Sequence, residues 1–172
     1  DAIIGIVRNL APTFGGINLE DIAAPRCFVI EDALQELGIP VFHDDQHGTA
    51  IAVLAGEINS LLVTGRKIED TKFVFAGAGA GGIGSTKLLL DHGATNVTLV
   101  DSTGIISRGR SDLTAVKSAM LDTTNPENTQ GGLAEAMRGA DVFIGLSAAD
   151  AVSPEMVSSM AKDSIVFAMA NP

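Results

Sequence analysis

The segment FVFAGAGAGGIG, residues 73–84, constrains the fold more than any other part of the sequence. Its apolar start is typical of a buried strand, and the closely spaced glycines lead into residues with helical spacing. Glycines at such a junction let the backbone turn tightly and approach a pyrophosphate, which the helix N-terminus then binds. The pattern G-x-G-x-x-G fits in two registers: Gly77, Gly79 and Gly82, or Gly79, Gly81 and Gly84.

A second apolar strand, residues 97–100, follows this helix and ends at Asp101, 24 positions after Gly77. An acidic residue at that distance accepts hydrogen bonds from the ribose of a bound dinucleotide. Asp101 favours NAD because it would repel the 2′-phosphate of NADP, but Arg108 and Arg110 either compensate for that charge or belong to a solvated loop. The alternative is a strand–helix turn without a ligand. The expected cofactor-binding residues are Gly77, Ala78, Gly79, Ala80, Gly81, Gly82, Ile83, Asp101 and Ser147.

Helical and strand-like patterns alternate along the rest of the chain. Extended patterns occupy residues 14–19, 39–42, 72–76, 97–100, 142–144 and 165–168. Helical patterns precede Pro12 and occupy residues 27–37, 48–63, 82–90, 111–120, 133–137 and 155–160. Aliphatic strands separated by helices predict an α/β fold with a Rossmann-type parallel sheet and crossover helices.

The composition excludes several classes of partner. The net charge is −10, and the chain has no Trp and no Tyr, which argues against nucleic acid binding. Apolar runs are too short to span a membrane, and no signal-peptide pattern opens the chain. The single cysteine, Cys27, suits a reducing cytoplasm and is interpreted as a small buried hydrophobic residue.

Carboxylates follow two of the short extended patterns. Glu20 and Asp21 come after GGINL, and Asp44 and Asp45 come after IPVFH. A helix between the two strands predicts parallel neighbours, whose carboxyl ends share one edge. Carboxylates gathered there repel one another unless a cation is present, and oxygen ligands select Mg²⁺ or Mn²⁺. Alternatively, Asp45 caps the next helix, and Glu20 with Asp21 caps a short turn. Histidines expected to pack or lie in loops are His43, His47 and His92.

Five motifs in order resemble those of the malic enzymes, particularly the shorter microbial type: FGGINLEDIAAPRCF, PVFHDDQHGTA, GAGAGGIG, LVDSTGII and FAMANP. The resemblance implies oxidative decarboxylation of L-malate to pyruvate and CO₂, with NAD or NADP as cofactor and Mg²⁺ or Mn²⁺. It also implies a homodimer or higher homo-oligomer of the full-length protein, and the single cysteine favours a cytoplasmic location. By resemblance, the metal ligands are Glu20, Asp21 and Asp45, Asp44 supports them without touching the metal, and Asn171 contacts substrate.

The resemblance further implies how the chain is divided. Residues 1–45 are expected to be a strand–helix–strand piece of the substrate domain that bears the metal, and residues 46–172 a nucleotide-binding domain truncated at its C-terminal end. The catalytic lysine and tyrosine of the family are expected before this segment. The lysines present are interpreted as solvated charges: Lys67, Lys72, Lys87, Lys117 and Lys162. We therefore expect the segment alone to bind cofactor with negligible turnover.

Two other functions remain open from the sequence. The first is a metal-independent dehydrogenase domain of the amino-acid or shikimate type, in which Glu20, Asp21 and Asp45 would lie far apart. The second is a module that senses NAD(P) without catalysis.

Overall fold

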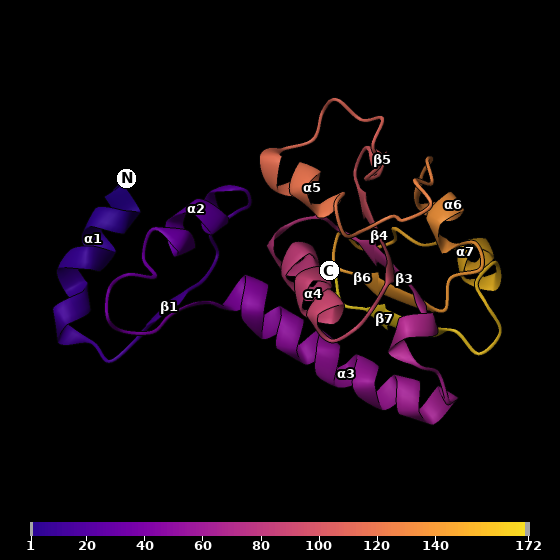
Figure 1. The fold of residues 1–172 in the computed structure, drawn as a ribbon, viewed down its shortest axis with the longest axis horizontal. Coiled ribbons are helices and arrows are strands. Elements are labelled where there is room, and N and C mark those ends of the chain that lie inside the picture. The colour runs from indigo at the N-terminus through magenta and orange to yellow at the C-terminus, as the bar shows by residue number, and fades with distance from the viewer. Residues whose placement is uncertain (1, 171–172) are drawn as a thin grey trace.

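The structure, a computed structural model, describes residues 2–170 and has a smaller and a larger part (Figure 1). The smaller part contains α1 (Ala2–Leu10), β1 (Ile17–Leu19), α2 (Arg26–Asp32) and β2 (Val41–His43). In the larger part, the long helix α3 (Thr49–Thr64) leads into a five-stranded sheet with flanking helices. Short 3₁₀ turns occur at Ala11–Thr13 and Ile68–Asp70.

The smaller part is built on two parallel strands. β1 and β2 pair in register from Ile17 opposite Val41 to Leu19 opposite His43. Leu19 packs with Ile30 and Leu34 of the intervening segment, which forms a small core of its own. This pairing confirms the prediction that the two carboxylate-bearing segments leave neighbouring strands at one edge.

The sheet of the larger part has the order β5-β4-β3-β6-β7. All its pairings are parallel except the one between β4 and β5. The predicted α/β class and the Rossmann-type sheet are therefore confirmed, with one short antiparallel strand added at the edge. The strands are β3 (Lys72–Ala76), β4 (Asn96–Asp101), β5 (Gly104–Ile105), β6 (Val142–Gly145) and β7 (Ile165–Ala168), and the later helices are α4 (Ala80–Asp91), α5 (Ala115–Met120), α6 (Leu133–Met137) and α7 (Pro154–Ser158).

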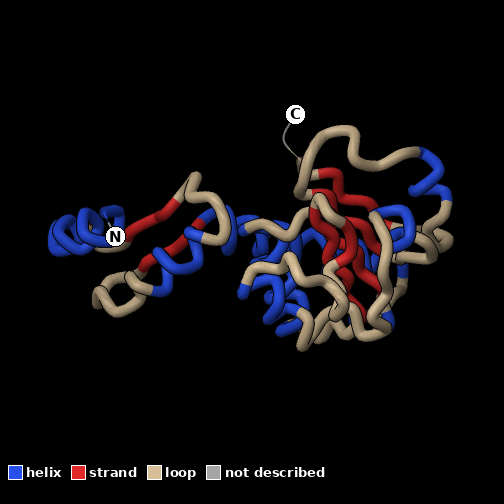
Figure 2. Tube along the Cα trace, turned by 90° about the horizontal axis from the view of Figure 1, so that it is seen from above, coloured by secondary structure: helices blue, strands red, loops and turns tan. Residues whose placement is uncertain are grey.

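Helices cover both faces of this sheet, as expected for parallel strands joined by crossovers (Figure 2). Phe73 and Phe75 of β3 point to one face, where they join a core with residues of α3, α4 and α5. Val74 and Ala76 point to the other face and pack with residues of α6 and α7. The carboxyl ends of β3, β4 and β6 thereby meet at one edge. Within residues 2–170, no helix has the length and apolar character needed to cross a membrane.

Two helices differ from the predicted ranges by more than two residues at one end. α2 ends at Asp32 because the following residues form tighter i→i+3 hydrogen bonds, such as Leu34 N–H to Glu31 O at 2.9 Å. α5 begins only at Ala115, where Thr114 Oγ1 accepts a hydrogen bond from the Lys117 amide. The helix predicted from residue 48 is preceded by a π-helical turn, Asp44–Gly48. The predicted domain boundary at residues 45/46 falls inside this turn and remains a prediction.

Candidate functional site

The glycine loop lies between β3 and α4, and its first register has a distinct geometry at each glycine. Gly77 adopts φ +120°, which makes the turn after the strand, and its N–H continues the β3–β4 pairing by donating to Val100 O at 2.8 Å. Gly79 leaves open space where a Cβ would stand. At Gly82 a Cβ would overlap the Gly77 carbonyl oxygen. These are the three requirements of a dinucleotide loop: a tight turn, room for a pyrophosphate, and close helix–strand packing.

The glycines of the second register serve a different contact. A Cβ at Gly84 would stand 2.7 Å from Gln46 O, and one at Gly81 would stand 3.2 Å from Asp45 O. α4 can therefore pack against the π-helical turn only because its first turns lack side chains on that side. The N-cap of α4 is Gly79, which has no side chain to cap the first turn, so the first amides of this helix donate to no side chain of their own N-cap residue.

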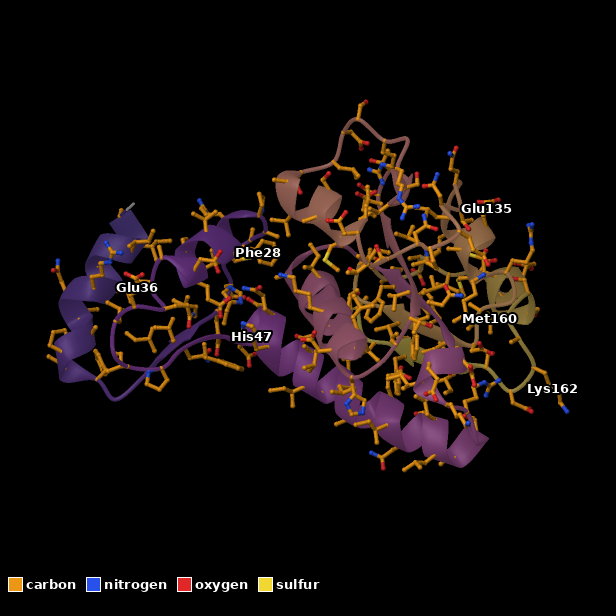
Figure 3. The ribbon with its side chains drawn as sticks, viewed as in Figure 1. Phe28, Glu36, His47, Glu135, Met160 and Lys162 are labelled. Atoms are coloured by element: carbon orange, nitrogen blue, oxygen red, sulfur yellow. The ribbon has the colours of Figure 1, made fainter. Side chains whose placement is uncertain are left out.

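A cavity of about 320 Å³ lies beside this loop. Its wall contains six of the nine expected cofactor-binding residues: Gly77, Ala78, Gly79, Ile83, Asp101 and Ser147. Ala80, Gly81 and Gly82 do not line it. The opposite wall comes from the smaller part, where Phe28 lies at the junction with the larger part (Figure 3). The sequence patterns did not indicate the remaining lining residues, which are Ala24, Pro25, Phe28, Ser102, Thr114, Val116 and Lys117.

Asp101 lines the cavity at the carboxyl end of β4 but is not an isolated negative charge. Its Oδ1 lies 2.8 Å from Arg110 Nη1 and 3.0 Å from the Thr103 amide, and its Oδ2 lies 3.1 Å from Arg110 Nη2 and 2.5 Å from Lys117 Nζ. Burial alone would raise the pKa of Asp101, but the hydrogen bonds from Arg110 and Lys117 outweigh it and lower the pKa to about 2. Asp101 is therefore ionised and closely neutralised.

This network decides between the two interpretations of the nearby arginines. Arg110 is largely buried and compensates for Asp101, whereas Arg108 is exposed and donates to Leu121 O. The interpretation of Lys117 as a solvated charge was wrong, because Lys117 pairs with the buried Asp101 carboxylate and lines the cavity. Arg110 also binds Asp112 at 2.6 Å, so the cluster has two acids and two bases.

The carboxylates of the smaller part meet at the shared edge of β1 and β2. Asp21 adopts φ 57°, a left-handed conformation that aspartate tolerates, and its N–H donates to Asp45 Oδ2 at 2.9 Å. Glu20 Oε1 accepts a hydrogen bond from Asn18 Nδ2 at 2.6 Å. Asp45 does not cap α3, whose N-cap residue Gly48 has no side-chain hydrogen bond. The helix-cap interpretation of Asp45 therefore has no support.

The expected metal ligands are close in space but do not form a ready site. Within residues 2–170, no group of three or more His, Cys, Asp and Glu side chains is arranged to hold a metal ion. Oxygen donors suit a hard divalent cation, yet Glu20 is bonded to Asn18 and Asp45 to the Asp21 amide. Glu20, Asp21 and Asp45 as ligands and Asp44 as their support stay predictions. Asn171 lies outside the described residues.

Sequence reasoning missed Glu31, the residue that contacts the π-helical turn from α2. Glu31 is 7% exposed, and its carboxylate lies 2.7 Å from Gln46 Nε2 and 2.7 Å from His47 Nε2. An acidic residue within a short helical pattern is normally interpreted as a surface charge, so no signal in the sequence indicated that Glu31 is buried. His43, by contrast, is fully buried, as expected for a packing residue, and so is Cys27.

The parallel sheet, the glycine loop at its edge and the cavity beside the loop define a dinucleotide-binding protein of Rossmann type. A family model described as "Malic enzyme, NAD binding domain" matches residues 46–172. The chain belongs to the malic enzyme family.

Relatives with known names agree with this assignment. The chain is similar to the NAD-dependent malic enzyme of Geobacillus stearothermophilus, with 53% identity over all of this chain and 36% of that protein. It is 48% identical to the NADP-dependent malic enzyme of Haemophilus influenzae, over all of this chain and 23% of that protein. The crystal structure of the NAD-dependent malic enzyme from Thermotoga maritima superposes with a TM-score of 0.96 and 46% identity, covering 99% of this chain and 46% of that one. The chain thus spans less than half the length of these relatives.

Proposed function

We propose that this chain is the cofactor-binding part, with the adjoining carboxylate strands, of an NAD(P)-dependent enzyme that oxidatively decarboxylates L-malate to pyruvate and CO₂. The observation that carries the proposal is the position of the glycine-loop cavity, which is closed on one side by the carboxylate-bearing smaller part. The family to which the chain belongs supports the same reaction.

The residues around the cavity have separate tasks in this proposal. The open backbone at Gly79 and the uncapped start of α4 bind the pyrophosphate. Phe28 and Ile83 give the cavity apolar walls that exclude water. When bound, NAD(P)⁺ would accept the hydride from C2 of malate, and the proton of the C2 hydroxyl would pass to a general base. The resulting 2-keto acid carries a carboxylate β to its carbonyl, which is the group lost as CO₂.

We further propose that the reaction depends on Mg²⁺ or Mn²⁺, with Glu20, Asp21 and Asp45 as ligands. The proposal is supported by their common edge and by the bond of 2.9 Å from the Asp21 amide to Asp45. The same contact disfavours a metal-independent dehydrogenase, which would keep these residues apart. Cytoplasmic location, homo-oligomeric assembly and contact of Asn171 with substrate remain predictions.

The test is NAD(P)H formation from L-malate by the intact enzyme that carries this chain, first with Mn²⁺ and then with a chelator. We expect turnover that is lost on chelation and restored by Mn²⁺. Turnover that persists in chelator would remove the metal from the proposal. Cofactor binding without turnover of malate by the intact enzyme would favour the sensing module.

A further inference from the structure

Glu31 is an unusual residue for the interior of this chain. It is a carboxylate with 7% exposure, and no lysine or arginine pairs with it in the described part of the chain. A buried carboxylate is costly unless hydrogen bonds satisfy its oxygens. Those bonds come from two consecutive residues, since Gln46 Nε2 donates to Oε2 and His47 Nε2 lies 2.7 Å from Oε1. His47 must carry its proton on Nε2 to complete this pair.

Both partners belong to the π-helical turn Asp44–Gly48, directly after Asp45. π-helical turns are rare, occur mostly as single turns, and are frequent at functional sites. Glu31 contacts this turn from α2, on the opposite side of the junction between the two parts. His47 lies at this junction, at the start of α3 (Figure 3).

The other side of the same turn contacts the cofactor loop. Gly84 and Gly81 of α4 lie against Gln46 O and Asp45 O so closely that a Cβ at Gly84 would stand 2.7 Å from the first oxygen. The turn is thus held between the Glu31 carboxylate and the start of the helix that we assign to the pyrophosphate. Asp45 itself is 43% exposed in its side chain, and the Asp21 amide donates to it. Its direction depends on the turn.

We infer that Glu31 is a positioning residue: it fixes the π-helical turn and thereby sets the direction of the Asp45 carboxylate relative to the cofactor helix. The inference rests on the proposed function for its consequence, since Asp45 is there a metal ligand. Residues that orient a metal ligand typically contribute 10- to 100-fold to metal affinity, an order-of-magnitude range.

The test compares Glu31→Ala with Glu31→Gln, and uses Glu36→Ala as the control. Glu36 is exposed and lies in the smaller part, away from the junction (Figure 3). Two quantities are measured on the full chain: exchange of the Asp21 amide proton by NMR, and Mn²⁺ affinity by calorimetry. Exchange of β3 amides reports whether the larger part stays folded.

We expect Glu31→Ala to speed exchange of the Asp21 amide proton about tenfold, because the single hydrogen bond from this amide to Asp45 would be weakened. Exchange of the β3 amides should not change. Mn²⁺ affinity should fall about 10- to 100-fold. Glu31→Gln keeps the shape and one acceptor oxygen but loses the charge and the second acceptor, so both quantities should lie between those of the parent chain and those of Glu31→Ala. Glu36→Ala should match the parent chain.

The possible outcomes distinguish the positioning role of Glu31 from the metal site of the proposed function. A folded Glu31→Ala chain with parental Asp21 exchange and Mn²⁺ affinity would overturn the inference. If the parent chain binds no Mn²⁺ but Asp21 exchange still responds, the metal part of the proposed function fails while the positioning role stands. If Glu31→Ala unfolds, the isosteric Glu31→Gln decides: parental Asp21 exchange and parental Mn²⁺ affinity in that variant would leave the carboxylate charge without a positioning role and overturn the inference.

Discussion

Glu57 is a carboxylic acid buried in the main core. It lies on the buried face of α3 between Val53 and Leu61, is fully buried, and neither of its oxygens has a hydrogen bond from any residue in the range 2–170. Burial penalises the charged form and raises the pKa of Glu57 from 4.5 to about 7. Stability should therefore depend on pH in a range where ordinary glutamates no longer titrate.

The sign follows from comparing the two states of the chain. Well below pH 4.5 the Glu57 carboxyl is protonated in both the folded and the unfolded chain, so its contribution to the free energy of unfolding is fully present. As the pH rises towards 7, the unfolded chain releases the proton while the folded chain retains it, and stability falls. The pKa difference between 4.5 and about 7 corresponds to about 3 kcal/mol, at about 1.4 kcal/mol for each unit. Above about pH 7 the loss is complete.

The variant Glu57→Gln has the same shape and cannot ionise, so it isolates this contribution. The free energy of unfolding should match that of the parent near pH 4 and exceed it by about 3 kcal/mol at pH 8. Urea unfolding followed by far-UV circular dichroism suits a chain without Trp or Tyr. The exposed Glu127, changed to Gln, serves as the control. A difference between Glu57→Gln and parent that stays constant from pH 4 to 8 would refute the reasoning.

Two further substitutions and one labelling experiment provide additional tests. Gly82→Ala places a Cβ on the Gly77 carbonyl oxygen, so NADH affinity in a fluorescence titration should fall at least about tenfold, whereas unchanged affinity would contradict the loop geometry. Lys117→Ala removes a cation beside Asp101, while Arg110 still pairs with this carboxylate. The affinity for NADP⁺ should therefore fall about tenfold more than the affinity for NAD⁺. Equal losses for the two cofactors would mean that Lys117 does not discriminate between them. Burial raises the pKa of the Cys27 thiol, so a disulfide reagent should label it only on unfolding, and rapid labelling of the folded chain would contradict its burial.

Much of the nucleotide-binding part could be predicted from the sequence because its signals are local. β3 has the predicted bounds, because four consecutive apolar residues, 73–76, directly precede a glycine. β5 was missed because two residues, Gly104 and Ile105, carry no periodicity. The end of α2 was predicted five residues late because Leu34 and Leu37 continue the helical spacing through turns that are no longer α-helical.

The candidate site was less predictable because its geometry depends on contacts between distant residues. The sequence shows that Asp44 and Asp45 follow a strand, but the π-helical turn that carries them is held by Glu31 and by the glycines of α4. No pattern within the turn encodes these partners. The two fitting glycine registers likewise became distinct only once Gly84 was found against Gln46 rather than beside the cavity.

Asp101 shows why a residue's position in a motif does not by itself define its task. An acidic residue at the end of the second strand of a dinucleotide-binding motif, here β4, favours NAD under two conditions. Its oxygens must be available to the ribose hydroxyls, and no nearby cation may neutralise its charge. Here Arg110, Lys117 and the Thr103 amide already donate to both oxygens. A ribose hydroxyl must therefore compete with charged donors, while a 2′-phosphate meets cations rather than a bare carboxylate. The acid at this position therefore gives no reason to exclude NADP, and we expect the partners of Asp101, more than Asp101 itself, to set the cofactor preference.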